Sequence, residues 1–174
     1  MKLVSSLLVN TAALWACAAS GHGSTAETFR RGFELCVVAR DANEGRVTQA
    51  ISRQGQSLLI KLPAVLSSAD LKWAKAVTKS TWFVLSGSHL ASTLRLKLKP
   101  AAVAGFQATL DRVIGGGDQI AILLNGEVVG VLVFTHRLAA DEIAIDASFF
   151  SDGTEEEKES DTQQLAQQIK STLY

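Results

Sequence analysis

The dipeptide Asn125-Gly126 stands between two apolar, β-prone runs and is the strongest constraint on how this chain folds. Residues 119–124 precede it and residues 127–134 follow it. A type I′ turn needs positive φ at both central residues, and Asn followed by Gly meets that need well. The sequence therefore predicts an antiparallel β-hairpin at this point of the chain.

Apolar runs bounded by turn residues predict further strands along the chain. These strands are expected at residues 33–39, 47–52, 57–62, 81–86, 93–99 and 143–149. The alternation is strictest where leucines alternate with Arg95, Lys97 and Lys99, a pattern typical of a strand that is buried on one face.

Three segments have the pattern of helices. The first, 69–78, follows a capping serine at Ser67 or Ser68 and has apolar residues at three-residue spacing. The second begins at Pro100 and ends before a triple glycine, and the third covers 162–173.

Together these elements predict an α+β fold with two small subdomains, residues 29–88 and 92–174. Each subdomain is expected to have a mostly antiparallel sheet covered by helix. Strands and helices do not alternate throughout, so a doubly wound nucleotide-binding fold is not expected.

The N-terminal segment has the layout of a secretory signal peptide. Lys2 precedes an apolar run that is shorter and more polar than a typical transmembrane helix. Cleavage is expected after Ala18, or as late as residue 26. One alternative is a lipoprotein with Cys17 as the lipidated residue, and another is an N-terminal core helix. The chain is therefore expected to be periplasmic or secreted, or lipid-anchored to the envelope, without a membrane span once the signal is removed.

Charge excludes nucleic acid as the partner. The chain has 17 Lys and Arg and 17 Asp and Glu, with no basic stripe. Cys36 lies in an apolar run and is expected to be a buried small hydrophobe. The acidic residues between 152 and 161 are expected to form a solvated loop that leads into the last helix.

Nothing in the sequence predicts a catalytic group, a metal site or a cofactor. His22, His89 and His136 lack the spacing of metal ligands. The segment 86–89 lacks the pattern of a hydrolase nucleophile elbow. The triple glycine at 115–117 follows a helix instead of opening one, which is the wrong place for a phosphate cradle.

The run from residue 47 to 63, VTQAISRQGQSLLIKLP, resembles the first periplasmic domain of SecD, an accessory subunit of the bacterial protein-export machinery. The hairpin at 120–129 and the helix start at 161–166 resemble the head subdomain of the same family. Two positions depart from the family: Ala64 stands where SecD usually has Gly, and Gly130 continues a strand where SecD has Ser-Ala-Pro.

This resemblance implies a base subdomain followed by a head subdomain, and a role in contact with polypeptide or with a component of the export machinery. The chain ends at Tyr174, where SecD continues into its membrane bundle, so a stand-alone exported protein without that bundle is expected.

The function expected from these features is non-catalytic binding, through an exposed strand edge or a cleft between the modules. The aromatic residues expected to form the binding surface are Trp73, Trp82, Phe106 and Phe134. The alternative is a small-ligand-binding or hydrolytic envelope protein with a polar cleft near His89 and His136. A third possibility is an inhibitor or assembly factor that imitates the SecD domain within the export complex.

Overall fold

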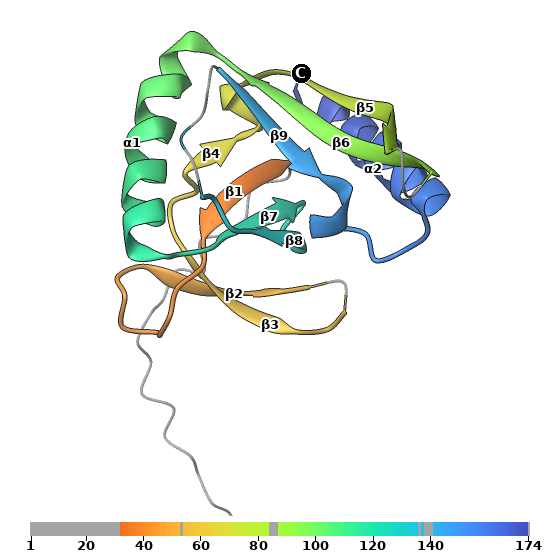
Figure 1. The fold of residues 1–174 in the computed structure, drawn as a ribbon. Helices are drawn as coiled ribbons and strands as arrows, with labels where there is room; N and C mark the ends of the chain where they lie inside the picture. Colours follow the sequence, from red (N-terminus) through yellow and green to blue (C-terminus); the bar gives the residue numbers. More distant parts are fainter. Residues whose placement is uncertain (1–31, 53, 84–86, 136, 138–140, 174) are drawn as a thin grey trace, which may run out of the picture.

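A four-stranded antiparallel sheet lies between the other two sheets of the computed structural model, which describes residues 32–52, 54–83, 87–135, 137 and 141–173 (Figure 1). Its strands, in spatial order, are β4 (Leu66–Ser67), β1 (Phe33–Val37), β7 (Ile120–Leu124) and β8 (Glu127–Leu132). The predicted hairpin is confirmed: Leu124 pairs with Glu127, and φ is 54° at Asn125 and 87° at Gly126. The central strands of this sheet thus come from distant parts of the described chain.

A two-stranded ribbon covers one face of the four-stranded sheet. It consists of β2 (Val47–Ile51) and β3 (Ser57–Lys61), close to the strands predicted there. Ala50 and Ile60 of the ribbon pack against Cys36, Leu123 and Val128 in a small second core. The ribbon therefore stabilises this face with few buried side chains.

A three-stranded sheet faces the other side, in the order β5 (Leu71–Phe83), β6 (Gly87–Leu98) and β9 (Glu142–Asp146). The alternating leucines of β6 point into the core as predicted, since Leu94, Leu96 and Leu98 are fully buried. Strand β9 ends at Asp146, and the 3-10 helix η2 (Ala147–Phe149) takes the place of the last predicted strand residues.

The prediction of a helix at 69–78 is wrong, because this segment begins the long strand β5. A β-bulge between Leu71 and Trp73 inserts one extra residue, so Leu71 and Ala74 both point into the core although they are three residues apart. Apolar residues at three-residue spacing are also typical of the apolar face of a helix, which is why the sequence predicts one here. Only one 3-10 turn, η1 (Ser68–Asp70), follows the capping serine, and Asp70 accepts hydrogen bonds from both the backbone N–H and the Oγ of Ser67 at 2.9 Å.

Two helices close the space between the sheets (Figure 1). Helix α1 (Pro100–Gly116) begins at the predicted proline and includes the first two glycines of the triple expected to follow it. Its C-cap is Gly117, which is left-handed at φ 66°. Helix α2 (Glu155–Ser171) packs on β5 and β6 and begins at Glu155, well before the predicted start. The acidic run expected as a loop is its first turn, because Thr154 caps it and negative charge suits a helix N-terminus. Each helix has 17 residues, and no helix within the described residues is long and apolar enough to cross a membrane.

One main core joins the two larger sheets and both helices. It includes Phe33 and Leu35 from β1, Leu96 from β6, Phe106 from α1 and Ile169 from α2. The α+β class and the antiparallel sheets are thus confirmed. The division into 29–88 and 92–174 stays a prediction, and strands from both of these segments pair with each other in the four-stranded and three-stranded sheets.

Candidate functional site: a cleft beside strand β8

A cleft of about 620 Å³ lies where the ribbon, strand β8 and the start of helix α2 meet. The ribbon and its turn supply Leu58 and polar side chains, including Gln54 and Gln56. Strand β8 supplies residues 128–131, and the segment from Phe149 to Asp161 supplies the third wall. Three separate parts of the chain are therefore needed to form this site.

Strand β8 is an edge strand, and its outer edge borders the cleft. Among the described residues, its only strand-like contact on that side is a single parallel bridge between Val128 and Ser52. The residues beyond it, Val129 to Val131, line the cleft. An edge of this kind presents backbone N–H and C=O groups with which another extended chain can pair.

The two edge strands of the three-stranded sheet carry charges that discourage such pairing, whereas residues 129–132 of β8 do not. Strand β5 has lysines at 72, 75 and 79, and β9 has Glu142 and Asp146. Residues 129–132 of β8 have no charged side chain and no proline. Because charged side chains and prolines are the usual means by which proteins keep sheet edges from pairing, residues 129–132 of β8 stay open to an added strand.

Gly130 sets how closely the third wall approaches β8. A Cβ at this position would lie 2.5 Å from the carbonyl oxygen of Phe149 and 3.1 Å from the Cβ of Phe150. Only glycine leaves room for the backbone that leaves η2 to pass so near the sheet. The cleft therefore depends on a residue at which the sequence departs from the SecD pattern.

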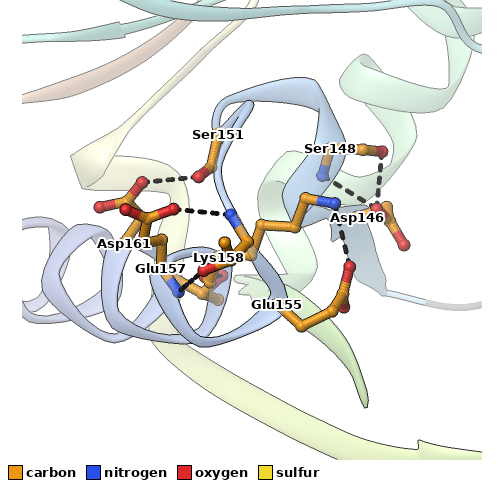
Figure 2. A network of polar contacts seen from close by, with 9 residues as sticks. Asp146, Ser148, Ser151, Glu155, Glu157, Lys158 and Asp161 are labelled. Atoms are coloured by element: carbon orange, nitrogen blue, oxygen red, sulfur yellow. Dashed lines mark hydrogen bonds and ion pairs between the residues drawn. The ribbon is translucent and has the colours of Figure 1, made fainter. Parts of the chain in front are cut away.

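Three carboxylates, Asp152, Glu157 and Asp161, line the cleft on the side of α2. Asp161 accepts a hydrogen bond from Ser151 Oγ at 2.6 Å, and Glu157 accepts one from the backbone N–H of Thr154 at 2.7 Å (Figure 2). Asp152 accepts one from Gln54 Nε2 at 3.3 Å. These bonds fix the carboxylates, and no Lys or Arg is among the described residues that line the cleft.

Cys36, Glu44 and Asp141, which do not line the cleft, have shifted pKa values. Burial, helped by the nearby charge of Glu34, raises the pKa of the Cys36 thiol to about 12. Hydrogen bonding to Lys61 lowers the pKa of Glu44, and hydrogen bonding to Lys97 lowers the pKa of Asp141. Cys36 is buried as predicted, and its burial makes it a poor nucleophile.

Three of the four predicted aromatic side chains, Trp73, Phe106 and Phe134, can be placed in the structure. Trp73 is half-buried beside Lys75, whose Nζ lies 4.9 Å from the ring centroid. Phe106 is only 1% exposed and packs edge-to-face on Phe134 at 6.3 Å, so it lies in the core and not on a surface. The side chain of Trp82 lies outside the described part of the chain.

Other predicted positions also lie outside the described residues: Cys17, His136 and the side chain of His89. Within the described residues, no three His, Cys, Asp or Glu side chains are grouped so that they could hold a metal ion. The cleft itself is not predicted by the sequence. Two features of the sequence are related to the cleft: Gly130 inside an apolar strand and the acidic run before the last helix.

No protein-family model matches the sequence, and neither does any curated protein. One similar solved structure is SecDF in its super-membrane-facing form, with a TM-score of 0.50, 19% identity, and coverage of 80% of this chain and 18% of that one. Another is a structure of SecDF described as a membrane component that enhances protein export, with a TM-score of 0.47, 21% identity, and coverage of 83% of this chain and 62% of that one. The chain thus spans less than two thirds of either SecDF chain. Its fold is that of a SecD periplasmic-like domain.

Proposed function

We propose that this protein is a non-catalytic binding protein of the cell envelope, which holds an extended polypeptide segment as an added strand along the outer edge of β8. The SecD-like fold supports a role connected with protein export. The predicted signal peptide at 1–18, with lipidation at Cys17 as its alternative, supports a location outside the cytoplasm. The partner is unfolded polypeptide or a component of the export machinery.

The observation that carries this proposal is the open edge of β8 inside a cleft. Strand addition uses backbone hydrogen bonds, which every residue except proline can make, so it suits a protein that must accept many sequences. The cleft adds apolar contacts from Leu58, Val128 and Val131 on one side of the added strand. Such binding needs no reacting group.

The test compares binding of a carboxymethylated, permanently unfolded protein with binding of the same protein in its folded form. Binding is measured by titration calorimetry on the purified chain. We expect the unfolded form to bind and the folded form not to bind. Val131→Lys places a charge on the open edge and is expected to weaken binding by about tenfold or more.

Val77→Lys is the matched control, because it makes the same substitution in the three-stranded sheet, away from the cleft. Circular dichroism checks that both variants keep the fold. Failure of the wild-type chain to bind the unfolded protein would overturn the proposed function. Equal weakening by both variants would show that the edge of β8 is not where the polypeptide binds.

A further inference from the structure

The charged side chains among the described residues of the cleft lie on one of its sides. Asp152, Glu157 and Asp161 all lie on the side of α2, and the described lining includes no basic side chain. Glu157 and Asp161 are four residues apart on one helix and so share a face. Negative charge that lines a concave site raises the local concentration of cationic groups.

Each of these carboxylates can accept further hydrogen bonds besides the one described above. Their donors are neutral: the Ser151 hydroxyl, the Thr154 backbone amide and the Gln54 side-chain amide. Each bond occupies one oxygen, and a carboxylate has a second oxygen with two further lone pairs. The basic residue nearest in sequence, Lys158, is paired with Glu155 at 3.0 Å and extends away from Ser151 and Asp161 (Figure 2).

The pleat of β8 determines which side chains of an added strand would meet this charge. Val128 and Val131 belong to the core under the ribbon, whereas Gly130 faces the backbone of Phe149 on the α2 side. Successive side chains of an added strand alternate between the same two sides. One set would therefore contact Leu58 and the valines, and the other set would lie toward the carboxylates.

We infer that the cleft selects extended segments in which Lys or Arg alternates with apolar residues. The apolar side chains pack toward the ribbon, and the cationic side chains meet Asp152, Glu157 and Asp161. This inference rests on the proposed strand addition and names the chemistry of its partner.

The experiment uses fluorescein-labelled peptides of about eight residues, the length of an ordinary strand. One alternates Lys with Val, a second Ser with Val, and a third Glu with Val. Fluorescence anisotropy on the purified protein is expected to give the tightest binding for the Lys peptide, about tenfold tighter than the Ser peptide at low salt. Added salt should reduce this ratio, because screening weakens exposed charge pairs.

The double variant Asp152→Asn and Asp161→Asn should reduce the preference for the Lys peptide over the Ser peptide. The amide that replaces the Asp161 carboxylate can still accept the Ser151 hydrogen bond, so the cleft keeps its shape. Glu156→Gln is the matched control, since Glu156 is exposed on α2 but does not line the cleft.

Equal binding of the Lys and Ser peptides would overturn this inference and leave strand addition standing. A preference for Lys that the double variant does not reduce would also overturn it, because the cations would then bind elsewhere. If no peptide binds, the proposed function fails and this inference fails with it.

Discussion

The single residue on which the cleft most depends is Gly130. Its φ is not in the left-handed region, so the reason for glycine here is space, since a Cβ would lie 2.5 Å from the Phe149 carbonyl oxygen. Gly130→Ala is therefore expected to lower the free energy of unfolding by about 1–3 kcal/mol, as overpacking commonly does. Urea denaturation measures the change.

Gly105→Ala is the control for that prediction. Gly105 is exposed in α1 and nothing lies within 4 Å of its ideal Cβ. Alanine should stabilise the helix there by about 0.5–1 kcal/mol. If Gly130→Ala were also stabilising, the close approach of the Phe149 backbone to β8 would be disproved.

Cys36 provides a prediction about pH. Its thiol has a pKa of about 12 in the folded protein against a usual value of 9.0. Well below pH 9 the thiol is protonated in both states, so the shift has no effect on stability there. Between pH 9 and 12 the unfolded chain loses this proton while the folded chain keeps it, so stability should fall as pH rises.

The measurement compares the pH dependence of unfolding in the wild type and in Cys36→Ala, with Cys17→Ser in both. The variant should lose less stability between pH 9 and 12 than the wild type does. Identical slopes would mean that the Cys36 thiol is not held in its neutral form by the fold.

Among the secondary-structure elements, the start of α2 is the part on which the acidic wall of the cleft depends. Glu157 accepts from the backbone N–H of Thr154 at 2.7 Å, and Thr154 Oγ1 accepts from the N–H of Glu157 at 3.3 Å. Thr154→Ala removes one half of this capping box and should cost about 0.5–2 kcal/mol. Thermal unfolding followed by circular dichroism gives the value.

Thr109→Ala in the interior of α1 is the matched substitution, since alanine is the better helix former and the hydroxyl of Thr109 donates back to the Gly105 carbonyl within the same helix. It should be neutral or slightly stabilising. If both variants lost the same stability, the Thr154 cap would not contribute more to stability than an ordinary helix residue.

Elements with strong local patterns could be predicted from the sequence. The Asn125-Gly126 turn and the helix that begins at Pro100 are both confirmed, because their backbone geometry is set by the residues themselves. Strand β5 could not be predicted, since its bulge displaces the alternation and its pairing with β6 is a tertiary effect. The cleft could not be predicted from the sequence either, because Gln54, Gly130 and Asp161 are far apart in the chain and line the same cleft only in the folded protein.

Across the complete fold, the main core takes side chains from nearly the full described length, from Phe33 to Ile169. We expect tryptophan fluorescence and far-ultraviolet circular dichroism to follow one urea transition with the same midpoint, because the two-state condition requires coincident probes. The tryptophans at 73 and 82 report on β5, whereas circular dichroism reports on both helices and all sheets. Two separated midpoints would instead support independent subdomains at 29–88 and 92–174.

The ribbon of β2 and β3 is joined to the rest of the fold by a small core in which only Ala50 and Ile60 of its own described side chains are buried. Regions with few buried apolar contacts open at low free energy. We therefore expect the ribbon to be the wall of the cleft that moves at the lowest free energy. Such movement would change the width of the cleft, to suit side chains of different size, without disturbing the layer between the two larger sheets.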